Sequence, residues 1–287
     1  MAVKILTDST SYIKDDILKE LDIIKISLSV KFEDEEFKEV EIDNDSFYRK
    51  MEEKGIPTSS QPSVAEMRDI MESVVKEGDS LLCIFISSEM SGTYSSAHMV
   101  RDMVLEKYPQ GRIEILDSRS NCMQLGYAAI AAAKAAKEGK DLQQVKKEAE
   151  ENIKRSRFLF APHNLTYLKK GGRIGTASAL IGNILKIIPI LTVENGVTTV
   201  LTKVRTKKSV IDAMIDKLSA DIKAYGIGEI TVHHINHLEG ALETVGKIKE
   251  AVKVDLDIKV CDIGPVIGLH VGPGTVGVVY YTEKAMR

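Results

Sequence analysis

Hydrophobic and polar positions alternate in blocks along the first half of the chain, and these blocks predict strands separated by helices. Val3 to Thr7 is a short apolar run with strand character, and the polar residues Asp8 to Ser11 are suited to cap a following helix. Ser63 to Glu66 forms a capping box that opens another helix, which stops at Gly78. Ser80 to Ile86 is apolar throughout, which is typical of a strand in a sheet covered on both faces. The remaining strands are predicted at 23–30, 32–37 and 112–116, a loop at 57–62, and helices at 12–20, 46–54, 64–77, 94–108, 123–136 and 142–155.

Strands that alternate with helices in this way build βαβ units around a largely parallel sheet. In such sheets, ligands bind at the carboxyl ends of the strands. Polar loops follow the predicted strands after Thr7, after Ile86 and after Leu116. These three loops are therefore expected at a ligand-facing edge of the sheet.

The second half of the chain combines helices with a hairpin. Asn195-Gly196 lies between two strand-like runs and is the strongest short hairpin signal in the sequence. The charged segment 146–157 marks the expected boundary between the halves. We predict an α/β protein of two α/β domains: residues 1–156 with a mostly parallel sheet flanked by helices, and residues 157–287 with a mixed sheet and helices. Strands of the second domain are predicted at 158–161, 187–194, 197–205, 229–235, 256–262 and 276–281, and helices at 209–224 and 239–252.

Composition narrows the class of protein. The chain has 287 residues, 44% of them hydrophobic and 28% charged, which is the balance of a soluble globular protein. The net charge of −3 argues against a nucleic-acid binder, and the acidic stretch 33–41 is expected to be a solvated face. No apolar run approaches the roughly 18 residues that a membrane span needs. The three scattered cysteines form neither a disulfide framework nor a CxxC zinc pattern, and Asp8 interrupts any signal-peptide core, so we expect a cytoplasmic protein.

The stretch from Leu168 to Thr176, LKKGGRIGT, is the most informative segment. It combines three positive charges with three glycines, which allow positive φ and close approach of a partner. Arg173 offers a planar fork of donors suited to carboxylate or phosphate. The segment predicts an anion-facing loop. Similar chemistry is expected at 87–94 and at 263–274, and a second basic cluster at 203–208 is either a solvated strand end or a dock for an acidic partner.

Three other motifs suggest chemistry that their context does not support. Gly272 to Gly277 matches G-x-G-x-x-G but runs into a predicted strand rather than a helix, so no nucleotide cofactor is expected. His233 and His234 are predicted on opposite faces of one strand, so no metal is expected. Ser91 with His270 suggests a serine hydrolase, but Glu89 stands where a nucleophile elbow requires glycine. A cap on the helix that begins near Gly92 is the simpler role for Ser91, and it is compatible with anion binding.

Eight segments, in this order, resemble the DegV family of fatty-acid-binding proteins, which serve as acyl-carrier subunits of bacterial fatty-acid kinase. The resemblance covers nearly the whole chain. The segments are Ile5–Thr10 (ILTDST), Ser59–Ser63 (SSQPS), Ser91–Tyr94 (SGTY), Asp117–Ser118 (DS), Tyr167–Ile174 (YLKKGGRI), Pro189–Leu191 (PIL), Lys203–Arg205 (KVR) and Gly264–Gly274 (GPVIGLHVGPG).

The resemblance implies a function without catalysis by this chain. A long-chain fatty acid would lie in an apolar tunnel, with its site at the junction of the two domains. A separate kinase with the ATP site would phosphorylate it, as a step in bacterial phospholipid metabolism. No cofactor, metal or nucleic acid is implied, and no membrane span, although transient contact with a membrane surface would fit.

The resemblance also assigns roles to residues. Ser59, Ser91 and His270 would contact the carboxylate, with Gly92 and Thr93 beside them. The two residues expected to face the kinase partner or the acyl phosphate are Arg173 and Arg205.

The chain departs from the family pattern at a few positions. The family usually has Thr at Ser59, so either Thr58 or Ser59 would contact the ligand. Val271 replaces a frequent Thr after the histidine, and the Asp-Gly motif usually found before the helix at Ser46 is absent. Two alternatives remain at this point: a hydrolase or acyltransferase that uses Ser91 and His270, and a regulatory lipid-binding module without a kinase partner.

Overall fold

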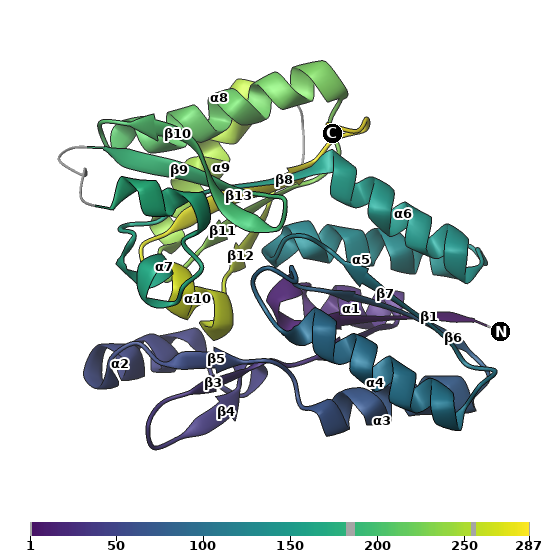
Figure 1. Cartoon of the computed structure of the whole chain (residues 1–287). Coiled ribbons are helices and arrows are strands. Elements are labelled where there is room, and N and C mark those ends of the chain that lie inside the picture. The colour runs from purple at the N-terminus through teal and green to yellow at the C-terminus, as the bar shows by residue number, and fades with distance from the viewer. Residues whose placement is uncertain (1, 182–186, 254–256, 287) are drawn as a thin grey trace. The chain divides into compact units, whose positions relative to one another are not determined.

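A computed structural model describes residues 2–181, 187–253 and 257–286 (Figure 1). Their contacts divide the chain into two compact units. We call Met1–Glu41 with Ser59–Ile153 the first unit, and Ile42–Thr58 with Lys154–Arg287 the second unit. The chain passes from the first unit to the second after Ile153, close to the predicted boundary. The segment 42–58 also belongs to the second unit, so a single division of the chain does not separate the two units. That residues 1–156 and 157–287 are separate domains stays a prediction.

The first unit is built on a four-stranded sheet of order β2-β1-β6-β7. Its strands pair in parallel, which confirms the predicted mostly parallel sheet. Its strands are β1 (Val3–Asp8), β2 (Ile23–Ile26), β6 (Ser80–Phe85) and β7 (Arg112–Asp117). Its helices are η1 (Ser9–Ser11), α1 (Asp15–Leu21), η2 (Glu39–Glu41), α3 (Val64–Lys76), α4 (Thr93–Lys107), α5 (Cys122–Lys137) and α6 (Leu142–Arg155), the last of which leads into the second unit.

Helices cover both faces of this sheet, with α3 and α4 on one face and α1 and α5 on the other (Figure 1). Side chains alternate across each strand, so Leu6, Cys83 and Phe85 pack under α3 and α4. The capping box begins α3 as predicted, because Ser63 Oγ accepts from the Glu66 amide at 3.4 Å.

The predicted strands 23–30 and 32–37 and the loop 57–62 are wrong in detail. The chain leaves β2 at Ser27 and forms a small separate sheet of β3 (Ser29–Lys31), β4 (Glu36–Lys38) and β5 (Thr58–Ser60). A turn closed by the bond from the Phe32 amide to the Glu35 carbonyl, 2.9 Å, interrupts what periodicity predicted as one strand.

Two other local predictions need correction. The helix predicted at 12–20 starts only at Asp15, because Tyr12 takes a left-handed φ of 49° after η1. The acidic stretch 33–41 is not solvated throughout, because Glu39 is buried. Its carboxylate accepts from Ser9 Oγ at 2.5 Å and from the Tyr12 hydroxyl at 2.9 Å.

The second unit contains a mixed six-stranded sheet of order β10-β9-β8-β13-β11-β12. Among the described strands of this sheet, β11 and β12 alone pair in parallel, so the predicted mixed sheet is confirmed. Asn195 and Gly196 join β9 to β10 with φ of 51° and 83°, the geometry that the hairpin signal predicted. The strands are β8 (Ser156–Ala161), β9 (Ile188–Glu194), β10 (Val197–Val204), β11 (Ile230–His234), β12 (Lys259–Asp262) and β13 (Val276–Tyr281). The predicted start of the strand at Leu256 lies outside the described residues.

Two long helices, α8 (Lys208–Tyr225) and α9 (Leu238–Val252), lie on one face of this sheet (Figure 1). The other helices of the unit are α2 (Asn44–Lys54), α7 (Thr166–Lys170), η3 (Gly175–Leu180) and α10 (Pro265–Val271). The segment 42–58 belongs here because α2 packs on α10: Asn44 Nδ2 donates to Asp262 Oδ2 at 2.6 Å, and the Tyr48 hydroxyl donates to the Ile263 carbonyl at 3.4 Å. In the part of the chain that the structure describes, no helix is long and apolar enough to cross a membrane.

A buried ionic group fixes α8 to the sheet. Asp221 is only 4% exposed, and its carboxylate accepts from Arg157 Nε at 2.9 Å, Lys217 Nζ at 2.7 Å and the Tyr280 hydroxyl at 2.7 Å. Burial, together with the bond to Asp221, raises the pKa of Tyr280. The carboxylate is therefore matched by two cations and a neutral donor.

Candidate functional site

The loop after β6 places Ser91 and Thr93 at the start of α4. The prediction that Ser91 caps this helix is wrong by one position, because the N-cap residue is Gly92. Ser91 Oγ still accepts from the Thr93 amide at 3.3 Å and lies 2.9 Å from Thr93 Oγ1. The arrangement presents two hydroxyls beside the positive end of a 15-residue helix, a suitable environment for an anionic oxygen.

The three polar loops meet at one edge of the parallel sheet, as the sequence predicted. The carboxylate of Asp8, at the end of β1, accepts from the Ile86 amide at 2.7 Å, and burial raises its pKa to about 6. After β7, Asp117 accepts from Ser88 Oγ at 2.6 Å and from the Arg119 amide at 2.8 Å. These bonds fix the loop that carries Ser91.

The segment around Ser59 also reaches this loop. Gly92 has no side chain, and an added Cβ would lie 2.6 Å from Gln61 Oε1, so the Gln61 amide lies directly against the backbone of Gly92. Ser59 is half-buried on β5, whereas Thr58 and Ser60 are exposed, and alternation along a strand turns Ser59 to the opposite side. The structure thus favours Ser59 over Thr58 as the buried hydroxyl. Sequence reasoning missed Gln61, although the residue lies inside the motif 59–63.

The predicted residues of the second unit centre on His270 in α10. His270 packs against Gly171, where a Cβ would overlap Nδ1 of the imidazole. Burial and then the charge of Arg173 lower the pKa of His270 to about 4. His270 is therefore a neutral imidazole near pH 7, with one nitrogen that donates and one that accepts.

The LKKGGRIGT segment is more ordered than the predicted loop. It contains the end of α7, a turn with positive φ at Gly172 (70°) and Gly175 (52°), and the start of η3. Gly171 has an ordinary φ of −77° and serves instead to admit His270. Short helices bounded by glycine or proline, such as α7 and α10, carry too few residues for helical periodicity to predict them.

Arg173 and Arg205 are exposed at different places in this unit. Arg173 Nη1 donates to the Gly171 carbonyl at 2.6 Å, so it lies beside the His270 contact. Arg205 follows the last residue of β10. Helix η3, which follows Arg173, bonds to β10 five residues before Arg205: Thr176 Oγ1 accepts from the Val200 amide at 3.2 Å.

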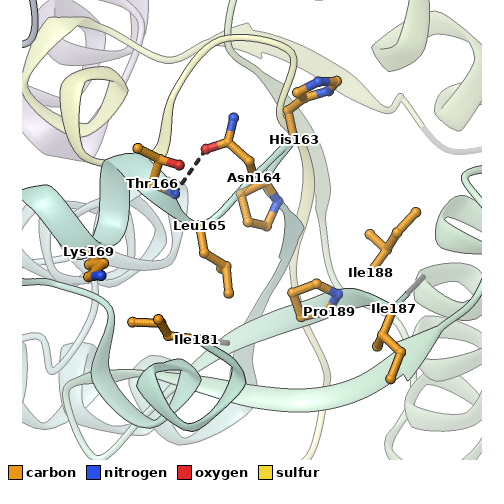
Figure 2. A pocket seen from close by; sticks show the side chains of 10 residues that line it. His163, Asn164, Leu165, Thr166, Lys169, Ile181, Ile187, Ile188 and Pro189 are labelled. Atoms are coloured by element: carbon orange, nitrogen blue, oxygen red, sulfur yellow. Dashed lines mark hydrogen bonds between the residues drawn. The ribbon is translucent and has the colours of Figure 1, made fainter. Parts of the chain in front are cut away.

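A pocket of about 340 Å³ opens in the second unit (Figure 2). Leu165, Ile181 and Pro189 surround its apolar part, with Ile187 and Ile188 at one side. The polar side chains at its margin are His163, Asn164, Thr166 and Lys169. Asn164 Oδ1 accepts from the Thr166 amide at 2.9 Å and so holds the first turn of α7. The pocket is apolar inside and polar at the margin, as a site for an amphiphilic ligand requires.

The motifs set aside in the sequence have structural roles. Burial lowers the pKa of His233 to about 4, and its Nδ1 lies 3.3 Å from the Cys261 carbonyl. His234 Nδ1 lies 3.1 Å from Asp262 Oδ1, so the two histidines diverge as predicted. Among the described residues, no three His, Cys, Asp or Glu side chains gather as a metal site. The G-x-G-x-x-G match leads from α10 into β13 and opens no helix.

Comparison with known proteins bears on what these groups do. The family model described as "Uncharacterised protein, DegV family" matches residues 2–283. The chain belongs to the DegV family. A DegV domain-containing protein of Clostridium acetobutylicum is 62% identical over 287 residues, covering 100% of both chains. Protein DegV of Bacillus subtilis is 33% identical over 285 residues, covering 98% of this chain and 99% of that one.

Solved DegV structures share the fold along its length. DegV from Bacillus subtilis, a fatty acid binding protein, matches with a TM-score of 0.89 and 32% identity over 98% of this chain and 99% of that one. A DegV lipid binding protein from Thermotoga maritima matches with a TM-score of 0.83 and 31% identity over 99% of this chain and 100% of that one. The predicted α/β architecture and family are confirmed.

Proposed function

We propose that this DegV protein binds one long-chain fatty acid, holds its carboxylate with neutral donors and presents it to a separate ATP-dependent kinase, which forms the acyl phosphate. The observation that carries the proposal is the full-length similarity, at 30% identity or more, to DegV proteins that bind fatty acid or lipid. The local chemistry of both units supports it.

Binding energetics require two kinds of surface. Each buried methylene contributes about 0.8 kcal/mol, so fourteen contribute roughly 11 kcal/mol. Association costs about 4 to 15 kcal/mol, so apolar burial alone leaves modest net affinity. The carboxylate must therefore not be left buried without partners.

The proposed head-group contacts are hydroxyls and a neutral imidazole. Ser91 and Thr93 present their hydroxyls at the start of α4, with half-buried Ser59 in the same unit. His270, neutral because its pKa is about 4, is able to donate to a carboxylate without the desolvation cost of a buried cation. A bound carboxylate would also favour the protonated imidazole, so binding should raise the pKa of His270.

The proposed place for the acyl chain is the apolar pocket of Figure 2. Helix α7 connects this pocket to the histidine: Leu165 and Thr166 line the pocket at the start of the helix, and Gly171 contacts His270 just after its end. Five or six residues of helix span roughly 8 Å at about 1.5 Å per residue. An amphiphile with its tail in the pocket therefore has a polar group within a short distance.

Ser91→Ala and His270→Ala are each expected to weaken fatty-acid binding by about ten- to a hundredfold, since loss of a partner for a buried charged group costs about 1–3 kcal/mol. Titration of delipidated protein with a fluorescent fatty acid measures the effect. Ser95→Ala, at an exposed position on α4, is the matched control and should bind normally. The double variant reports whether both side chains act on one head group, as a coupling energy. Unchanged affinity in both single variants would refute the head-group assignment.

Arg173→Ala is expected to spare fatty-acid binding and to lower phosphorylation of the bound fatty acid at least tenfold, because the exposed guanidinium is a planar set of donors suited to an anionic phosphate group. Single-turnover phosphorylation with the kinase subunit and ATP measures it. Arg173→Lys keeps the charge but loses the planar fork, so its phosphorylation rate should lie between those of the parent and Arg173→Ala. If Arg173→Ala instead loses lipid affinity but keeps normal phosphorylation per bound lipid, the proposed role of Arg173 in phosphorylation is wrong.

A further inference from the structure

A second hollow of about 360 Å³ in the second unit has different chemistry from the apolar pocket. Lys207, Lys208, His163 and His237 supply its polar wall. Val210, Ile211 and Val276 supply an apolar floor. Glu243 is the single carboxylate among its lining residues, and that group lies 3.5 Å from Lys247 Nζ in the next turn of α9. The wall is therefore predominantly cationic.

The two lysines are placed where folding gains nothing from their charge. Lys207 caps α8 and Lys208 is its first residue, the end of a helix at which positive charge is unfavourable. The first turn of α8 contains no acidic residue, and within the described ranges neither ammonium group forms an ion pair. Positive charge at a helix N-terminus without a compensating acidic partner is unfavourable for folding, and such departures are more often found at functional sites than elsewhere.

Each of the two histidines lies beside a glycine. His237 precedes α9, and a Cβ on Gly240 would lie 2.5 Å from His237 Nε2, so the imidazole rests on the first turn of that helix. Gly274, at a φ of 82°, brings its backbone within van der Waals distance of His163, with 3.6 Å from an added Cβ to the His163 Cβ. Both histidines line the hollow.

We infer that this hollow binds a phosphate monoester that carries a small apolar group. Two ammonium groups and two imidazoles match a dianionic phosphate, and the Val210–Ile211 floor matches the apolar substituent. The inference is independent of fatty-acid binding. The hollow shares three lining residues with the apolar pocket, Pro162, His163 and Ile188. Lys207 and Lys208 line the hollow but not the apolar pocket.

The test is titration of the full-length, isotope-labelled protein with phenyl phosphate and, separately, with inorganic phosphate, followed by amide chemical shifts. We expect saturable shifts around 207–211 and 237–240, with phenyl phosphate the tighter ligand. Lys207→Ala/Lys208→Ala should weaken binding at least tenfold while fatty-acid affinity is unchanged. Lys223→Ala/Lys249→Ala removes the same charge from the opposite ends of α8 and α9 and should bind as the parent does.

Co-sedimentation with vesicles of phosphatidylcholine with and without phosphatidic acid distinguishes a free monoester from a lipid head group. Phenyl phosphate binding without sedimentation assigns a soluble ligand. Sedimentation that requires phosphatidic acid and Lys207/Lys208 assigns a lipid head group. Equal binding by the Lys207→Ala/Lys208→Ala variant and the parent, or no saturable shift with any of these probes, would overturn the inference.

Discussion

Replacing Asp221 with alanine is expected to lower the free energy of unfolding by about 3–5 kcal/mol, because it leaves the largely buried guanidinium of Arg157 without its carboxylate partner. The carboxylate bonds to Arg157, Lys217 and Tyr280, and the Arg157 side chain is only 14% exposed. Once the carboxylate is gone, the guanidinium stays largely buried, with only a distant contact to Glu194 at 3.8 Å. The expected loss of stability therefore reflects an uncompensated guanidinium charge rather than one lost hydrogen bond.

Urea unfolding followed by circular dichroism measures this loss. Asp216→Ala is the matched control, since Asp216 lies on the same helix but is exposed, and it should change the free energy of unfolding by less than about 0.5 kcal/mol. Asp221→Asn keeps the shape and removes the charge, and it should be destabilised to a similar degree. A loss below about 1 kcal/mol in Asp221→Ala would contradict the role of this carboxylate.

Gly171→Ala is expected to weaken fatty-acid binding by about tenfold or more while the protein stays folded. This loss is the expected cost of removing one hydrogen-bond partner from a buried charged group. The backbone of Gly171 has a φ of −77°, which alanine adopts without strain. Its methyl group, however, would overlap the imidazole of His270, so the ring must move away. Affinity for a fluorescent fatty acid and the free energy of unfolding, measured on the same sample, separate binding from folding.

The neighbouring glycine provides the control. Gly172 has a φ of 70° and no atom within 4 Å of an added Cβ, so Gly172→Ala strains the backbone without touching His270. It should cost about 1–2 kcal/mol of stability and leave fatty-acid affinity nearly unchanged. If both variants bind equally well, the position of His270 does not govern the site.

The parallel sheet and the edge at which its polar loops meet could be predicted from the sequence because their signals are local. Ser80 to Ile86 is apolar throughout, and polar residues follow three strands directly. Parallel strands bring their carboxyl ends to one edge, so the positions of Asp8, Ser88 and Asp117 followed from order along the chain. The capping box at Ser63 and the Asn195-Gly196 hairpin were predictable for the same reason.

The remainder depends on contacts between distant residues. The sequence places Glu39 in an acidic stretch that is predicted to be solvated. Its burial depends on hydrogen bonds from Ser9 and Tyr12, which lie about thirty positions earlier. The pairing of Gly171 with His270 joins residues almost a hundred positions apart, and no local pattern encodes it. Helix α2 likewise joins the second unit through Asp262 and Ile263. The head-group roles of Ser59, Ser91 and His270 stay predictions that come from resemblance.

The central claim is that this DegV protein binds a fatty acid, and native mass spectrometry tests it most directly. Delipidated protein is incubated with a mixture of saturated and unsaturated fatty acids and then desalted. We expect one fatty acid per chain, absent from the Ser91→Ala/His270→Ala double variant. Folded protein with no stoichiometric adduct, together with hydrolysis of a p-nitrophenyl ester that Ser91→Ala abolishes, would contradict the account and identify a serine hydrolase instead.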